Sequence, residues 1–393
     1  MNNIMKYLDW RGDLSFAQDP LNEVDNLILS TLSYIEYDGI VPFKIQEGSV
    51  VLSEIAQIAY DAIDFEDPHT KNPFFERIPE LLLKAAGTNR FGSLRLSCYI
   101  NRLNYDNSEQ FSAVVFTIHE QLHYIAFRGT DDNLIGWKED FQMSFMDEVQ
   151  AQRDAVEYSR YLLKDLEGEI YLGGHSKGGN LAVYVAASLE ELQHRLLAVY
   201  NNDGPGFQEN FLKSQGYHNI LPKIHTYIPK SSVIGMLMEH LEDYVVVNSN
   251  QKGIMQHNAF SWEVLGRHFV YKSVLERSSI FLNQALRQWL NQVTIEERAV
   301  FVEGLFEIIH ASGLSTISGI TSEKRIAVNG MIKAYNNMSP ETKKFMNKLI
   351  FKFIEEGQKV LMQTIEEEIN IGRLQMNGRV VRRRGKGYIK LKR

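Results

Sequence analysis

The chain has 393 residues, a length that suggests two or three domains. With 44% hydrophobic and 23% charged residues, its composition excludes a disordered or low-complexity chain. The one cysteine, Cys98, excludes an internal disulfide framework and a metal site built from several thiolates, and the net charge of −7 argues against nucleic-acid binding.

Residues 1–89 are predicted to be mostly helical, because apolar residues recur every three or four positions in 21–32 and 50–63. Residues 1–13 lack the basic segment and apolar core of an export signal. No stretch has the roughly 18–20 consecutive apolar residues of a membrane-spanning helix. We therefore expect a cytoplasmic protein of bacterial type.

Residues 90–270 are predicted to form an α/β core. The stretches 94–103, 111–118 and 123–127 are rich in aromatic and β-branched residues, which is typical of strands. From residue 149 onward, predicted helices alternate with predicted strands, and this alternation favours a mostly parallel sheet with helices on both faces. The helices are 149–166 and 180–191, and the strands are 169–172, 196–200, 223–228 and 243–247.

Strand patterns end near residue 270, so residues 271–372 are predicted to form a helical extension. One helix covers 273–291, a second begins at the capping-box sequence of 294–297, and a third begins at Ser339-Pro340. The chain is therefore divided into a domain of 1–270, this extension, and a tail of 373–393.

The pentapeptide Gly174-His175-Ser176-Lys177-Gly178 follows a predicted strand and precedes a predicted helix. It has the G-x-S-x-G pattern in the strand–turn–helix context of a nucleophilic serine. Such a sharp turn needs residues without side chains near the serine, and Gly174 and Gly178 meet that need. We predict that Ser176 is a nucleophile, with a glycine-rich turn and a chance serine as the alternative.

Upstream, the predicted strand that ends at Phe127 continues into Arg128-Gly129-Thr130. This ending can place the backbone N–H of Thr130 beside the serine. The helix that begins near Lys177 points its N-terminus at the same spot. The two amides are predicted to form an oxyanion hole, and the Lys177 side chain is not expected to contribute.

Together with Trp137 and Asp140, these motifs resemble those of the class 3 lipases of the α/β-hydrolase superfamily. The chain is more similar still to a bacterial group of lipase-like proteins of uncharacterised function, through residues 8–13, 201–207 and 256–262. The resemblance implies an α/β-hydrolase fold and hydrolysis of a carboxylic ester or thioester.

The resemblance also implies the order serine, acid, histidine along the chain, with the histidine in a loop after a late strand. His257 lies in such a loop and is the predicted base. His240 and His268 are further candidates, and an ordinary surface histidine is the alternative for His257.

The position of the acid departs from the class 3 pattern, because Ser232 stands where that family carries an aspartate. A serine cannot hold the charge that stabilises an imidazolium. Asp203 directly follows the strand after the elbow helix, and pancreatic lipases look similar at this point. We predict Asp203 as the acid, while a turn-forming role for it and the candidates Glu239, Glu242 and Asp243 stay open.

Residues 119–123, His-Glu-Gln-Leu-His, match the H-E-x-x-H zinc motif. Zinc binding requires both His119 and His123 on one face of a helix, whereas the residues on both sides favour strands. A hairpin is therefore predicted here, and a zinc metallopeptidase is kept as a minor alternative.

Residues 373–393 contain nine Lys or Arg and no acid, so the other 372 residues carry a net charge of −16. Such a run is usually a solvated tail. Weak contact with an anionic membrane surface is an alternative, and no nucleic-acid partner is expected.

The sequence thus predicts a serine hydrolase with Ser176, His257 and Asp203 as its triad, acting on a small acyl ester or lipid without cofactor or metal. Any cover over the site would come from residues 234–241 or from the carboxy-terminal helices. The serine at position 232 motivates a second hypothesis, an inactive hydrolase-fold binding or scaffold module.

Overall fold

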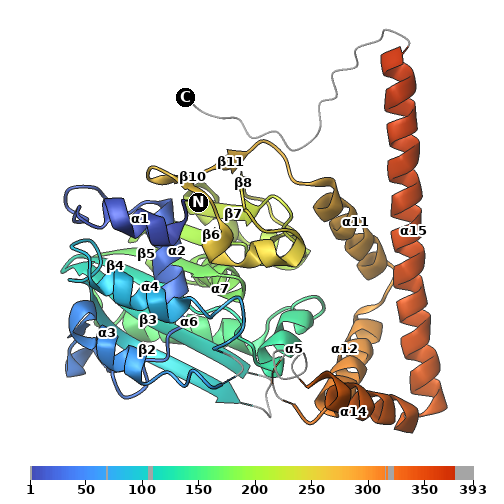
Figure 1. Cartoon of the computed structure of the whole chain (residues 1–393), viewed down its shortest axis with the longest axis horizontal. Helices are drawn as coiled ribbons and strands as arrows, with labels where there is room; N and C mark the ends of the chain where they lie inside the picture. The colour runs from blue at the N-terminus through green and yellow to red at the C-terminus, as the bar shows by residue number, and fades with distance from the viewer. Residues whose placement is uncertain (1, 68–69, 105–108, 315, 317–322, 377–393) are drawn as a thin grey trace.

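The computed structural model describes residues 2–67, 70–104, 109–314, 316 and 323–376 (Figure 1). A nine-stranded sheet forms its centre, in the order β1-β2-β3-β4-β5-β6-β7-β8-β11. The strands are β1 Val50–Val51, β2 Arg95–Asn104, β3 Glu109–His119, β4 Leu122–Phe127, β5 Glu169–His175, β6 Leu196–Asn202, β7 Ile224–Pro229, β8 Tyr244–Val247 and β11 Tyr271–Lys272.

The five strands from β4 to β8 run parallel, which confirms the α/β class predicted from the alternating pattern. The sheet as a whole is mixed, because β1 to β3 pair antiparallel on one side and β11 pairs antiparallel with β8 on the other. Parallel strands bring their carboxyl ends to one edge. Phe127, His175, Asn202 and Pro229 end four of these strands at that edge.

Ten α-helices are described before the extension. They are α1 Ile4–Arg11, α2 Glu23–Leu32, α3 Leu52–Asp61, α4 Ile78–Ala86, α5 Leu134–Gln142, α6 Gln150–Leu162, α7 Lys177–Ser188, α8 Glu190–Gln193, α9 Glu209–Leu212 and α10 Gln215–Ile220. Helices α1 to α4 lie within the first 89 residues, which were predicted to be mostly helical, and the helices predicted at α6 and α7 are present. Helix α5 was not predicted.

Helices cover both faces of the sheet, as predicted. From β4 to β8 each strand lies beside its predecessor, and right-handed crossovers in one direction put the connecting helices on one face. Accordingly α6, α7 and α10 pack there, while α1, α2 and α4 cover the other face (Figure 1). In β3, Val114 and Phe116 face the amino-terminal helices, whereas Ala113 and Val115 face the other layer. The first 89 residues are thus needed to bury the sheet.

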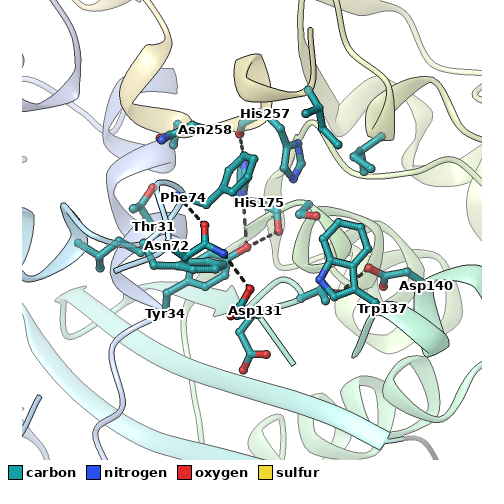
Figure 2. A pocket seen from close by; sticks show the side chains of 18 residues that line it. Thr31, Tyr34, Asn72, Phe74, Asp131, Trp137, Asp140, His175, His257 and Asn258 are labelled. Atoms are coloured by element: carbon teal, nitrogen blue, oxygen red, sulfur yellow. Dashed lines mark hydrogen bonds between the residues drawn. The ribbon is translucent and has the colours of Figure 1, made fainter. Parts of the chain in front are cut away.

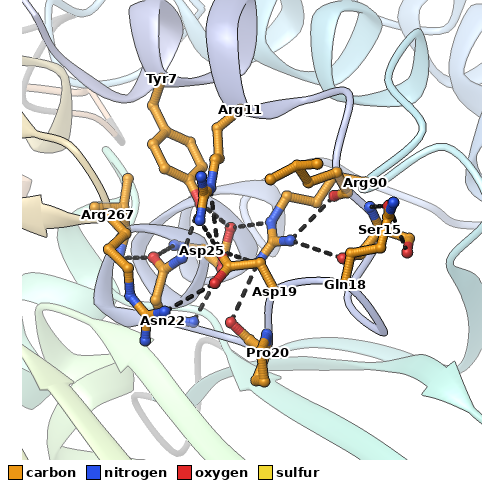
Figure 3. Close-up of polar contacts among 12 residues, drawn as sticks. Tyr7, Arg11, Ser15, Gln18, Asp19, Pro20, Asn22, Asp25, Arg90 and Arg267 are labelled. Carbon is orange, nitrogen blue, oxygen red and sulfur yellow. Dashed lines mark hydrogen bonds and ion pairs between the residues drawn. The ribbon is translucent and has the colours of Figure 1, made fainter.

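A buried ion pair fastens the amino-terminal helices to the chain that leads into β2 (Figure 3). The Arg90 guanidinium binds both carboxylate oxygens of Asp25, at 2.7 and 2.5 Å, and both side chains are 0% exposed. The Tyr7 hydroxyl donates to the same carboxylate at 2.8 Å. The remaining Arg90 donors reach the backbone oxygens of Leu14, Ser15 and Pro20. Burying two charges costs desolvation energy, and this many hydrogen bonds are needed to offset that cost.

The helices of the extension are α11 Arg277–Asn291, α12 Ile295–His310, α14 Lys324–Asn337 and α15 Pro340–Met376. The predicted capping box is present, because Thr294 Oγ1 accepts from the Glu297 N–H and the Glu297 carboxylate accepts from the Thr294 N–H, both at 3.2 Å. None of the helices in the described part of the chain combines the length and apolar character needed to cross a bilayer. Residues 377–393, which hold most of the predicted basic tail, lie outside the described residues.

Replacing Arg90 with methionine should lower the free energy of unfolding by about 3–5 kcal/mol, because the buried Asp25 carboxylate loses its partner. Urea unfolding followed by circular dichroism measures this. Arg160→Met is the control. Arg160 is exposed and lies 3.9 Å from Glu191, so its loss should cost no more than about 1 kcal/mol. Equal costs for the two variants would show that the buried pair does not hold the fold.

Candidate active site

The turn between β5 and α7 holds Ser176 in a strained conformation, with φ 58° and ψ −134°. A residue with a side chain rarely adopts positive φ, and such strain is concentrated at functional sites. The flanking glycines make the turn sterically feasible. A Cβ on Gly174 would lie 2.2 Å from the Gly178 carbonyl carbon, and a Cβ on Gly178 would lie 2.0 Å from the Phe127 oxygen. The sequence therefore folds this turn tightly against the end of β4.

The residues that follow β4 also lie close to Ser176. A Cβ on Gly129 would lie 3.0 Å from the Ser176 Cβ. Thr130 comes next, and its hydroxyl donates to Asp140 Oδ2 at 2.7 Å. Helix α5 carries Asp140, so this helix fixes Thr130 beside the serine. The other predicted oxyanion donor, Lys177, is the first residue of α7, where a helix leaves its backbone N–H groups without internal acceptors.

The Lys177 side chain points away from the site and is 1% exposed. Its Nζ lies 2.8 Å from Glu139 Oε2 and 3.0 Å from the Gln110 carbonyl oxygen. Glu139 Oε1 also accepts from the Ala151 N–H, near the start of α6, at 2.7 Å. Lys177 thus fastens the elbow helix to α5 and α6, and its charge is neutralised inside the protein.

Asp203 directly follows β6 and is 0% exposed, with φ 56°. Its Oδ2 lies 2.6 Å from His257 Nδ1. Its Oδ1 accepts from the Ser232 hydroxyl at 2.5 Å and from the Gly235 N–H at 3.1 Å. The structure therefore brings Asp203 and His257 together. It also gives Ser232, the residue at the expected acid position, a direct contact with the carboxylate.

The Ser232 loop is held in turn by the first turn of α11, in the extension. The Glu276 N–H donates to the Lys230 oxygen at 2.6 Å. The Ser279 hydroxyl donates to the Ser232 oxygen, and the Ser231 hydroxyl donates to the Glu276 carboxylate. Residues after 270 thus support the segment that contacts Asp203.

His257 ends a 3₁₀ turn, Gly253–His257, between β8 and the short strand β9 (Val264–Leu265). Its backbone oxygen accepts a hydrogen bond from His175 Nε2 at 2.8 Å, and the two imidazole centroids are 4.4 Å apart. Because Nε2 of His175 donates, its Nδ1 is the acceptor for the Tyr34 hydroxyl, at 3.2 Å. Burial keeps the pKa of His175 well below its usual range, so this imidazole is neutral and positions His257.

Ser176 and His257 line one cavity, at the carboxyl edge of the parallel strands (Figure 2). Its apolar wall comprises Phe74, Phe75, Ile78, Trp137, Ile234, Ile254 and Ala259. Phe74 lies edge-on to the His257 ring, with centroids 6.1 Å apart. The wall thus combines residues from four separate parts of the chain.

Residues 72–78, which the sequence did not indicate, form part of the cavity lining. Asn72 Nδ2 donates to Asp132 Oδ1 at 2.8 Å, and Asn258 Nδ2 donates to the Pro73 oxygen at 2.5 Å. Of the two segments named as sources of any cover, residues 234–241 contribute Ile234 to the lining, whereas no described residue of the carboxy-terminal helices lines the cavity.

The remaining histidine and acid candidates lie elsewhere. His240 Nδ1 lies 3.0 Å from Glu242 Oε1, and His268 is half exposed near Glu23. Glu239 pairs with Arg287 at 2.8 Å. None of these candidates, nor Asp243, is among the described residues that line the cavity.

The H-E-x-x-H residues form a β-hairpin, as predicted, since His119 ends β3 and His123 lies in β4. His123 Nδ1 is 2.9 Å from Thr117 Oγ1, and its Nε2 is 2.9 Å from the Glu167 oxygen. The helix that a zinc site of this pattern needs is absent at residues 119–123.

The model of the Mbeg1-like family matches residues 85–307, more than half of the chain. The chain belongs to the Mbeg1-like family. The lipase-like relationship predicted from the motifs is confirmed at the level of this family. The matched part of this Mbeg1-like chain contains the elbow, Asp203, Ser232 and His257. No curated protein sequence matches the chain.

Solved structures similar to this Mbeg1-like chain include three lipases. M37 lipase is 13% identical over 54% of this chain and 69% of its own, with a TM-score of 0.33. A propeptide complex of Rhizomucor miehei lipase is 16% identical over 51% and 70%, with a TM-score of 0.32. The lipase of Rhizopus microsporus var. chinensis is 14% identical over 52% and 78%, with a TM-score of 0.31.

Replacing Asp140 with asparagine should change how stability depends on pH. Burial raises the pKa of Asp140 to about 6, against the opposing effects of Lys177 and the Thr130 hydroxyl. A carboxyl with a raised pKa stabilises the fold while protonated and loses that contribution as pH rises through about 6. Relative to wild type, Asp140→Asn should therefore gain about 1–2 kcal/mol between pH 4.5 and 8.

Urea unfolding at several pH values measures this difference. Asp165→Asn is the control, because Asp165 is exposed and its carboxylate accepts a hydrogen bond from the Gln46 side chain. A difference that stays constant with pH for Asp140→Asn would show that Asp140 does not titrate in this range.

Proposed function

We propose that the protein is a serine hydrolase that cleaves a carboxylic ester or thioester, with Ser176 as nucleophile, His257 as base and Asp203 as acid. The observation that carries the proposal is the 2.6 Å contact between His257 Nδ1 and Asp203 Oδ2, beside a cavity that His257 shares with a strained serine. Membership of a lipase-like family agrees with this reaction class.

The proposed reaction has two stages, acylation of Ser176 and release of the acyl group by water, and each group acts once in each stage. With Nδ1–H bonded to Asp203, the Nε2 atom of His257 takes the proton of Ser176 as its oxygen attacks the carbonyl carbon. The N–H groups of Thr130 and Lys177 stabilise the oxyanion, and His257 passes the proton to the leaving alcohol or thiol. Water then releases the acyl group by the same steps. The Asp203 carboxylate stabilises the imidazolium throughout.

Ser232 has a physical role in this proposal. Its hydroxyl and the Gly235 N–H hold one carboxylate oxygen of Asp203, so the other oxygen faces His257. A serine at this position therefore complements an acid on β6. This contact supports the enzyme over the inactive scaffold.

A fluorophosphonate probe should label the native protein at Ser176, because the probe reacts with serines activated by a neighbouring base. Labelling read by peptide mass spectrometry should vanish in Ser176→Ala and persist in Ser53→Ala, an exposed serine of α3. Unlabelled native protein, together with no turnover of short- and long-chain p-nitrophenyl esters, would favour the scaffold hypothesis.

Two variants should separate the acid from its support. Asp203→Asn should lower kcat by about 10³–10⁴-fold, since the imidazolium loses its counter-charge. Ser232→Ala should lower kcat about tenfold with little change in KM, because one charge-assisted hydrogen bond to Asp203 is lost. Ser232→Thr, which keeps a hydroxyl, should restore most of the rate.

Ser231→Ala is the matched control, because the neighbouring hydroxyl contacts Glu276 instead of Asp203. Its kcat should stay within about twofold of wild type. A loss as large as that of Ser232→Ala would assign the effect to the loop as a whole. Full turnover by Asp203→Asn would show that another residue is the acid.

A further inference from the structure

The cavity that contains Ser176 is small. Its volume is about 90 Å³, whereas an engineered protein cavity of about 150 Å³ binds benzene. On that scale the space beside the serine holds a chain of roughly three or four carbons. Sites for larger organic ligands are commonly about 300–1,000 Å³. The cavity therefore fits a short acyl group.

A second, larger hollow adjoins this cavity. Its volume is about 370 Å³, and Tyr34, Phe75 and Ile78 line both spaces. The lining of the second hollow includes the buried apolar side chains of Ile35 and Ala59, so it offers apolar surface close to the serine. The residues that line both spaces form a partition, and this partition decides how long a chain the site can accept.

Phe75 is the member of the partition without a separate structural task. The Tyr34 hydroxyl lies 3.2 Å from His175 Nδ1 and helps to hold that imidazole (Figure 2). Ile78 is the first residue of α4 and belongs to the buried core between the amino-terminal helices and the sheet. Phe75 lies in the loop before α4 and is only partly buried. Its ring can therefore be changed without removing a core residue or a contact to His175.

Backbone and ring contacts fix the position of Phe75. Its N–H donates to the Asn72 carbonyl oxygen at 2.8 Å, and the Asn72 side chain donates to Asp132 at 2.8 Å. The ring centroid lies 5.4 Å from that of Tyr34 and 6.5 Å from that of Phe74. Rotating the ring out of the partition would forfeit these packing contacts. The partition is thus a fixed wall.

We propose that Phe75 sets the acyl specificity of the active site: acyl groups of up to about four carbons fit beside Ser176, and the Phe75 ring excludes longer chains from the adjoining hollow. The proposal rests on the hydrolase function proposed above. A longer chain leaves its extra methylenes in water, which forfeits about fourfold in binding for each methylene, or it strains the packed wall.

A series of p-nitrophenyl esters tests the proposal: acetate, butyrate, octanoate and dodecanoate, each below the concentration at which it forms micelles. The leaving group is the same throughout, and dividing kcat/KM by the rate constant of alkaline hydrolysis removes differences in intrinsic reactivity. The native protein should cleave butyrate at least about tenfold faster than octanoate. Octanoate cleaved as fast as butyrate would overturn the acyl limit and leave the hydrolase function standing.

Phe75→Ala should raise the octanoate-to-butyrate ratio at least about tenfold, because removing the ring joins the two hollows. Phe75→Trp should lower the butyrate-to-acetate ratio about threefold or more, because the larger ring narrows the cavity. Each ratio compares two substrates on one variant, so the fraction of folded molecules cancels.

Phe65→Ala is the matched control. The Phe65 ring is 44% exposed and is not among the described lining residues of either hollow, so both ratios should stay within about twofold of native. Ratios that stay at the native values in both Phe75 variants would show that another residue sets the chain length. If no ester is cleaved and the fluorophosphonate probe leaves Ser176 unlabelled, the hydrolase function fails and the acyl limit fails with it.

Discussion

The buried carboxylate of Asp203 is the contact on which the rest of the site depends. A desolvated charge must be satisfied by hydrogen bonds, and Asp203, which follows β6, obtains them from two other chain segments. His257 comes from the loop after β8, and Ser232 and Gly235 come from the loop after β7. If this carboxylate were displaced, both loops would lose a common partner.

Helical segments before and after the α/β core both contact this site. Helix α11, in the extension, holds the Ser232 loop through Glu276 and Ser279. On the opposite side, Tyr34 follows α2 and holds His175, while residues 72–78 line part of the cavity. The α/β core supplies the proposed reacting groups, and the flanking helical parts set their environment.

Steric strain is concentrated around Ser176. Ser176 and Asp203 both adopt positive φ at the ends of neighbouring strands, where glycines allow close approach of the backbone. The Lys177 side chain is buried against Glu139, so its charge is neutralised inside the protein. Among the described residues that line the cavity there is no lysine or arginine.

The sequence by itself determined the features that rest on local sterics and periodicity. These include the G-x-S-x-G turn, the alternation of helices with parallel strands, the capping box at Thr294 and the hairpin at 119–123. The resemblance to lipases also proposed Asp203 and His257, through the order of the triad and the positions of these residues after strands. Tertiary structure alone decided that Ser232 contacts Asp203, that residues 72–78 line the cavity and that the amino-terminal helices bury one face of the sheet. Those features depend on contacts between segments far apart in the chain, and no local pattern in a single sequence specifies which distant segments will meet.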